Sequence, residues 1–412
     1  MEKLLPVLFV VSIACISCKS EERKEASDIP EYAQSLDNLS IYSTIPEPAY
    51  EIILEQDVSF GNREVFFGSI ISDVESDEIG RVYIADAHTK TIHIYDPKGS
   101  HLRSIGREGS GPGEFRMIRA IELTDRHLLA LDPEQFKISK YDLNTFEFVR
   151  DIDISLYDAR EQQPSWVDWT QDEGLFYRPI NFFVNPDDNY LLIFGDQTVG
   201  ALDNLEGRTW EISVFSPSEE RYLAHDVLSL RADMNSFTFD DGSRISQVPF
   251  KPEAHLDSND EQMVYGWGND LLFKWYNTSG DYQQSFYYSR QNVAVKLDEI
   301  IAYYERDLAN HEELRDHFLR GFRNSDLPDQ WPAFHHLKLD DENRIWIAVV
   351  LEDIEVHEWW VLEKTGELIT RFEWPRDEPI EVVRNGYLYT RETSEMDEIS
   401  IVRYRIELNP KD

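Results

Sequence analysis

A four-strand unit that recurs along the chain restricts the possible folds more than any other feature. Each copy begins with a short apolar strand and a turn rich in Asp, Asn or Gly. A β-branched or aromatic strand, a strand ending in an aromatic residue, and a last strand after a Gly-containing turn follow. Apolar side chains alternate with a period of two, which favours strands over helices. A series of such units from about residue 68 onward predicts the blades of a β-propeller.

The first apolar run of each unit predicts the inner strand of its blade. We expect these strands at Ile70–Val74, Ile118–Leu123, Ile180–Val184, Ile245–Phe250, Phe334–Leu339 and Ile380–Val383. The sixth unit lacks a fourth strand, whereas Tyr50–Leu54 has strand character but no blade. Because an open ring would expose sheet edges, we expect Tyr50–Leu54 to close the sixth blade as its outer strand.

One segment between the fourth and fifth units has helical rather than strand periodicity. Apolar residues recur there at helical spacing, at Leu297, Ile300, Ile301, Tyr304, Leu308, Leu314, Phe318 and Phe322. This spacing predicts a helical insertion over residues 296–322. The insertion can pack on the propeller for stability, or it can cover one mouth of the central tunnel.

The turn after the first unit carries a more specific motif. Gly109-Ser110-Gly111-Pro112-Gly113-Glu114-Phe115, with Ile105-Gly106 before it, resembles the inter-blade turn of NHL-type propellers. Over about residues 50 to 408, the chain resembles the six-bladed β-propeller lipoproteins of Bacteroidota. The resemblance implies an all-β fold: a six-bladed β-propeller of four-stranded blades, closed by an N-terminal strand, with one helical insertion.

The first residues have the pattern of an export signal. Lys3 precedes an apolar run, Leu4–Ile16, that is too short to span a membrane and fits a secretory signal. Small residues followed by Cys18 resemble the lipobox of bacterial lipoproteins, which implies a signal peptide over residues 1–17 and acylation of Cys18. Ser17 precedes Cys18 and the polar region starts directly after it. Cys15 remains the alternative acylation site.

The region after the signal is expected to connect a membrane to the body. Residues 18–45 are polar and contain few large apolar side chains, so we predict a flexible tether there and the propeller over residues 46–412. The stretch Cys18–Glu22 resembles the acidic export tag of surface lipoproteins. It implies an exported outer-membrane lipoprotein, with the membrane leaflet and exposure at the cell surface left open.

The charge balance excludes one class of partner. With 40 basic and 79 acidic residues, the formal net charge is −39. Such a surface repels phosphate backbones, so we expect no nucleic-acid partner. It also has no general attraction for anionic lipid, and we expect membrane contact only through the lipid anchor.

Several side chains are candidates for a binding site at a channel mouth. Arg119, Arg178 and Arg384, at or near the starts of inner strands, could converge on an anionic or carbonyl-bearing ligand, or could pair with carboxylates. His335 and His336 should point to opposite faces of their strand, with one facing the tunnel and unable to share an ion with its neighbour. Trp166 and Trp169 could cap the channel or stack on a ligand, and loop packing is the alternative.

No motif assigns a reaction. The chain shows no Ser elbow, paired Cys and His, or His-Glu-x-x-His motif, and we expect no cofactor or metal. The acidic pairs Asp187-Asp188 and Asp340-Asp341 fit turns. We therefore predict a membrane-anchored binding propeller with a small-molecule or protein ligand, and leave enzymatic activity open. The alternatives are a metal-dependent hydrolase or lyase acting in the tunnel, and a structural subunit of an outer-membrane assembly.

Overall fold

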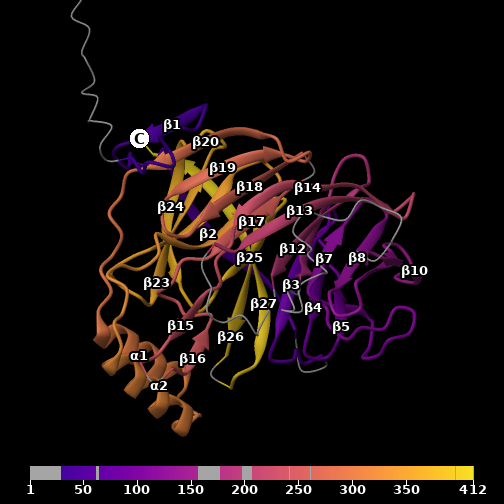
Figure 1. Cartoon of the computed structure of the whole chain (residues 1–412). Helices are drawn as coiled ribbons and strands as arrows, with labels where there is room; N and C mark the ends of the chain where they lie inside the picture. Colours follow the sequence, from indigo (N-terminus) through magenta and orange to yellow (C-terminus); the bar gives the residue numbers. More distant parts are fainter. Residues whose placement is uncertain are drawn as a thin grey trace, which may run out of the picture.

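The computed structural model describes residues 29–61, 65–155, 177–196, 207–240, 242–259, 261–394 and 396–411. Six of the seven sheets of the described residues have four or five strands and are arranged around a common centre as blades (Figure 1). Neighbouring inner strands contact one another from blade six to blade one, from one to two and from two to three. They do so again from blade four to five and from five to six. The predicted six-bladed β-propeller is confirmed.

The blades follow one another along the chain, each numbered from its inner to its outer strand. Blade one contains β3 (Ile71–Ser76), β4 (Val82–Asp86), β5 (Thr91–Tyr95) and β6 (His101–Ile105). Blade two contains β7 (Ala120–Leu123), β8 (His127–Asp132), β9 (Lys137–Asp142) and β10 (Phe148–Asp153). Blade three contains β11 (Tyr177–Val184), β12 (Tyr190–Asp196), β13 (Thr209–Ser216) and β14 (Arg221–Arg231).

The second half of the ring has one five-stranded blade. Blade four contains β17 (Ala254–Ser258), β18 (Gln262–Trp267), β19 (Leu272–Asn277), β20 (Tyr282–Tyr288) and the added strand β1 (Leu39–Tyr42). Blade five contains β21 (Phe334–Leu339), β22 (Ile345–Val350), β23 (Val356–Leu362) and β24 (Leu368–Pro375). Blade six contains β25 (Ile380–Arg384), β26 (Tyr387–Thr393), β27 (Ile399–Pro410) and β2 (Tyr50–Phe60).

Blade six closes the ring with strands from both ends of the body. β2 pairs antiparallel with β27, from Tyr50 opposite Pro410 to Phe60 opposite Ile401. The prediction that Tyr50–Leu54 forms the outer strand of this blade is confirmed, and the strand extends further than expected. Phe60 is fully buried between rings of blades one and six.

Part of the segment expected to be a tether packs against blade four. β1 lies parallel to β20, with Leu39 opposite Ser285. Ala33 is fully buried against Leu272 and Tyr287. The apolar residues that make this contact, Ile29, Ala33, Leu36 and Leu39, are few and lie in an otherwise polar segment. The packed body therefore includes residues before 46, whereas residues 1–28, with Cys15 and Cys18, lie outside the described residues.

The inner strand of blade four differs from the prediction at Ile245–Phe250. The inner strand is β17, and the predicted segment instead contributes β16 (Arg244–Ser246), which pairs with β15 (Ser236–Thr238) in a hairpin. Val248 and Phe250 are buried in a cluster with the helices, not in a blade. The segment is buried, as its apolar residues predict, but it packs against the helices and not within a blade.

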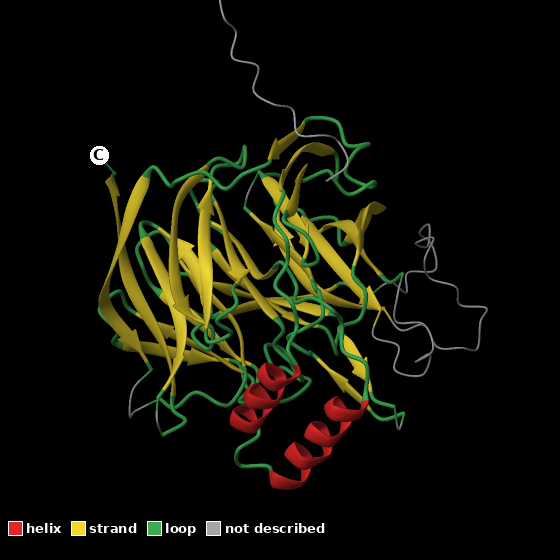
Figure 2. Ribbon diagram, turned by 90° about the vertical axis from the view of Figure 1, so that its left-hand side faces the viewer, coloured by secondary structure: helices red, strands yellow, loops and turns green. Residues whose placement is uncertain are grey.

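The helical insertion is confirmed and consists of two helices. α1 (Leu297–Asp307) and α2 (Glu312–Asn324) lie side by side at one end of the propeller (Figure 2). Ile300, Tyr304 and Phe322 are buried against the segment that carries β15 and β16. No helix in the described part of the chain is long and apolar enough to span a membrane.

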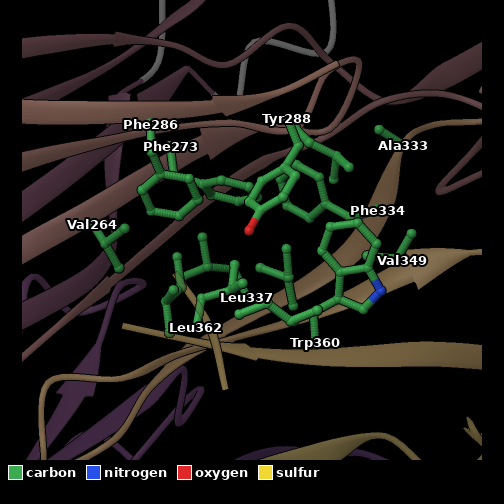
Figure 3. Close-up of a cluster of buried hydrophobic side chains, with 14 of the residues drawn as sticks. Val264, Phe273, Phe286, Tyr288, Ala333, Phe334, Leu337, Val349, Trp360 and Leu362 are labelled. Carbon is green, nitrogen blue, oxygen red and sulfur yellow. The ribbon is translucent and has the colours of Figure 1, made fainter. Parts of the chain in front are cut away.

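Large side chains fill the space between blades four and five (Figure 3). Phe273 and Phe286 pack from blade four toward Phe334 and Trp360 of blade five. Tyr288 Oη donates a hydrogen bond to the Gly366 carbonyl at 2.7 Å, so the polar end of this buried ring is satisfied. This interface fixes the inner strand β21, which supports the site described below.

Candidate functional site

Charged side chains of the inner strands line the central channel. Asp73 and Glu75 come from β3, and Glu122, Asp257 and Glu381 come from β7, β17 and β25. Lys338 of β21 lies among them. Burial alone would lower the pKa of Lys338, but the nearby carboxylates, first Asp257 and then Glu381, raise it. The ammonium group is therefore a counter-ion of an acidic channel.

Two of the channel carboxylates join neighbouring blades. Asp73 Oδ2 accepts a hydrogen bond from the Ile121 amide at 2.8 Å, and Asp257 Oδ2 accepts one from the Leu339 amide at the same distance. Each bond links one inner strand to the next, which satisfies an amide that the open edge of the sheet leaves unpaired. Both carboxylates have a structural role. Burial raises the pKa of Asp73 to about 6 and also raises that of Asp257.

A pocket of about 430 Å³ opens at the start of β17 and β21, where helix α1 faces the inner strands. Its walls include His335, His336, His357, Arg376, Tyr303 and Phe334. We call this cavity the mouth pocket. A concave site that combines aromatic walls with a few polar groups is typical of small-molecule binding.

Hydrogen bonds fix the protonation of the two central imidazoles. His335 Nε2 lies 2.8 Å from the carbonyl oxygen of Pro249, which can only accept, so Nε2 carries the proton. His335 Nδ1 is then an acceptor, and the Nε2–H group of His357 donates to it at 2.8 Å. The mouth pocket therefore contains two neutral imidazoles in assigned tautomers.

Burial keeps the histidines of the mouth pocket uncharged at neutral pH. Burial, and then the positive charge of Arg376, hold the pKa of His335 well below its usual range. Burial also lowers the pKa of His336 to about 3 and that of His255 to about 4. These neutral rings can donate hydrogen bonds to a ligand or accept them from it, and they add no positive charge to the pocket.

The structure puts His335 and His336 on the same pocket, contrary to the expectation of opposite faces. The register between β21 and β22 shifts between Phe334 and Leu337. A bulge of this kind re-aims side chains, so two neighbours can line one cavity. His336 also stacks on Trp359, with the ring planes 8° apart.

The three predicted arginines do not converge on one ligand. Arg119 Nε donates to the Ile180 carbonyl at 3.4 Å, and Arg178 lies 3.6 Å from a carboxylate oxygen of Glu134. Arg384 is the last residue of β25 rather than near its start, and its charge acts on Glu75 in the channel. The expected pairing with a carboxylate describes Arg178, whereas Arg384 acts on Glu75 through its charge without a direct ion pair among the described residues. Trp166 and Trp169 lie outside the described residues.

Sequence reasoning missed three groups that complete the mouth pocket, His255, His357 and Arg376. His357 lies on β23 and Arg376 follows β24, so neither belongs to an inner strand. The turn prediction for Asp340-Asp341 is correct, because Asp340 accepts the amides of Glu342 and Arg344. Across the described ranges, no three His, Cys, Asp or Glu side chains are arranged to hold a metal ion.

Comparison with known proteins supports the fold. Residues 63–216 match the model of the family DUF5128, described as "6-bladed beta-propeller". A DUF4221-family structure from Bacteroides vulgatus superimposes with a TM-score of 0.53 and 11% sequence identity, covering 89% of this chain and 100% of that chain. At this identity the likeness concerns the fold alone.

Two further solved structures are more distant. A candidate exported protein from Bacteroides fragilis gives a TM-score of 0.49 with 12% identity, covering 90% of this chain and 99% of that chain. Regucalcin from Agrobacterium tumefaciens, a calcium-binding protein, gives 0.41 with 9% identity, covering 91% and 99%. No curated protein is detectably similar in sequence. The family model and the blade order together identify the chain as a six-bladed β-propeller.

Proposed function

We propose that this protein is an exported lipoprotein, anchored through Cys18, whose propeller binds a small polar molecule in the mouth pocket. The pocket itself is the observation that carries the proposal. It has the volume of a small-molecule site, and it is built from fixed inner strands on one side and the helical insertion on the other. His335, held by Pro249 and His357, gives the pocket polar groups of defined orientation.

The export and anchor part of the proposal rests on the N-terminal pattern. An apolar run ends at small residues before Cys18, and the sequence turns polar immediately afterward. The outer membrane is the expected location, and its surface leaflet is favoured by the acidic residues that follow Cys18. The packed residues from Ile29 onward leave only a short connection between Cys18 and blade four.

Binding explains the described residues better than the hydrolase or lyase alternative. That alternative places a metal in the central tunnel, and the described part of the channel offers no three-ligand cluster for it. Asp73 and Asp257 are already engaged by backbone amides of the next blade. Lys338 offsets part of the remaining negative charge.

A fragment screen tests the binding proposal. Ligand-observed NMR of the purified protein with neutral, anionic and cationic fragments should give hits that His335→Phe weakens about tenfold or more, because the ring keeps its volume but loses both polar nitrogens. His88→Phe is the matched control, since His88 is exposed on blade one. Equal binding by the two variants would remove the mouth pocket as the site.

A further inference from the structure

Arg376 is a positive charge at the wall of the mouth pocket. Its guanidinium donates to the Ile354 carbonyl and to His335 Nδ1, both at 3.3 Å, and stacks over the Trp331 ring at 5.1 Å. None of the carboxylates among the described residues forms an ion pair with it. The neighbouring Arg306, in contrast, pairs with Glu355.

The missing ion pair distinguishes Arg376 from two other arginines of this chain. Acidic residues outnumber basic ones by 79 to 40, so carboxylates are abundant. Two other arginines with little exposed surface have them: Arg344 pairs with Asp340 at 2.7 Å, and Arg403 pairs with Asp57 at 2.6 Å. A charge removed from water without a partner is unfavourable. Burial lowers the pKa of Arg376, and the nearby charge of Glu355 offsets this only in part.

The neighbouring imidazole holds this guanidinium in place. Because His335 Nε2–H is committed to Pro249, Nδ1 is the acceptor, and its lone pair is shared between His357 at 2.8 Å and Arg376 at 3.3 Å. A guanidinium has five N–H donors, and the acceptors named above engage two of them. Within the described residues the other donors have no acceptor. Arg376 is therefore oriented in advance and keeps donors for a ligand.

We infer that the ligand of the mouth pocket carries a carboxylate group, which Arg376 binds with two parallel hydrogen bonds. The inference rests on the proposed binding function. The planar fork of a guanidinium matches the two oxygens of a carboxylate. The neutral imidazoles around it add no competing charge. Of the other charged residues that line the pocket, Lys251 and Arg306 are basic, Glu253, Glu355 and Asp377 are acidic, and Arg306 pairs with Glu355.

The rest of the ligand is expected to be largely apolar or aromatic. Tyr303, Phe334 and Val248 line the pocket beside Arg376. The volume of 430 Å³ equals that of about 14 water molecules at roughly 30 Å³ each. An organic acid of the size of an aromatic or medium-chain carboxylic acid fits this space. The negative charge of the whole protein opposes such an anion, so moderate salt should strengthen binding.

The test compares acids with their neutral amides. Benzoate against benzamide, nicotinate against nicotinamide, and hexanoate against hexanamide are titrated into the full chain and followed by NMR. At least one acid should bind about tenfold or more tightly than its amide. Arg376→Gln should remove that preference and leave the amide unchanged, and Arg376→Lys should restore it only in part, because it keeps the charge and loses the fork.

Arg371→Gln is the matched control. Arg371 lies on β24, near the same part of blade five, but it faces Glu358 at 3.6 Å and does not line the pocket. It should leave acid and amide binding unchanged. Thermal unfolding of each variant shows whether a loss of binding reflects loss of the fold.

The outcomes separate the two proposals. If acids and amides bind alike, or if Arg376→Gln and Arg371→Gln behave alike, the carboxylate inference is overturned. If His335→Phe still weakens fragment binding in that case, the mouth pocket remains the binding site. If His335→Phe has no effect on any fragment, the proposed function itself fails.

Discussion

Glu75 offers a sharp test of the electrostatics of the channel. Its carboxyl group lies on β3 near Asp73, and Arg384 lies close enough to interact with it. Burial and the charge of Asp73 together raise the pKa of Glu75 to about 8, although the positive charge of Arg384 opposes this rise. The substitution Glu75→Gln removes this titration and keeps the shape of the side chain.

The direction in which the free energy of unfolding changes with pH follows from the number of protons bound by the folded and unfolded states. Between pH 4.5 and about pH 8 the native protein holds the proton of Glu75 and the unfolded chain has lost it. The free energy of unfolding of the wild type therefore falls as pH rises through this window. The raised pKa sets an upper limit of about 5 kcal/mol, at 1.36 kcal/mol per unit. Because the side chain keeps contact with water, we expect about 1–3 kcal/mol.

Urea denaturation at pH 5 and pH 9, followed by tryptophan fluorescence, measures this effect. At pH 5 the free energies of unfolding of Glu75→Gln and the wild type should differ little. At pH 9 that of Glu75→Gln should exceed that of the wild type by about 1–3 kcal/mol more than at pH 5. Glu78→Gln, in the exposed turn after β3, is the control and should show no such pH dependence. An equal effect of Glu75→Gln at both pH values would refute the raised pKa.

Two further substitutions test ring closure and the anchor. Phe60→Ala should lower the free energy of unfolding by about 3–5 kcal/mol, because it empties a fully buried contact between the first and last blades; Phe66→Ala, at a ring that is 62% exposed, should change it by less than about 0.5 kcal/mol. Cys18→Ala should abolish incorporation of radiolabelled fatty acid and release the protein from membrane fractions. Labelling that persists in Cys18→Ala and disappears in Cys15→Ala would assign the anchor to Cys15.

The fold was predictable because its signals are local and repeated. A period of two marks each strand, and the need to cover sheet edges gave Tyr50–Leu54 its place in blade six. The prediction failed in blade four, where Val248 and Phe250 form an apolar run that packs on helices instead of blades. Hydrophobicity shows that a segment is buried, but not which partner buries it.

The candidate site was only partly predictable, for a different reason. His335 was identified from its place before an inner strand, but His357 and Arg376 lie on or after other strands of the blade. Only the pairing of β21, β22, β23 and β24 brings the three together. The bulge that turns His336 toward the same cavity depends on register, which no local pattern in the sequence encodes. The predicted arginines are easier to recognise in the sequence, but Arg178 pairs with Glu134 and the charge of Arg384 acts on Glu75.

The pairing of β2 with β27 has a consequence for the order of folding. Asp57 and Arg403, which form an ion pair across this seam, are separated by 346 residues. The strands of blades one to five, including the added strand β1 of blade four, all precede β25 in the chain, but the last blade must pair β2 with a strand from the far end. Until then, β2 and the edge of β26 remain unpaired and prone to association with other chains. A chain exported N-terminus first would therefore pass through an open-ring state, and its lifetime would depend on how soon β27 arrives.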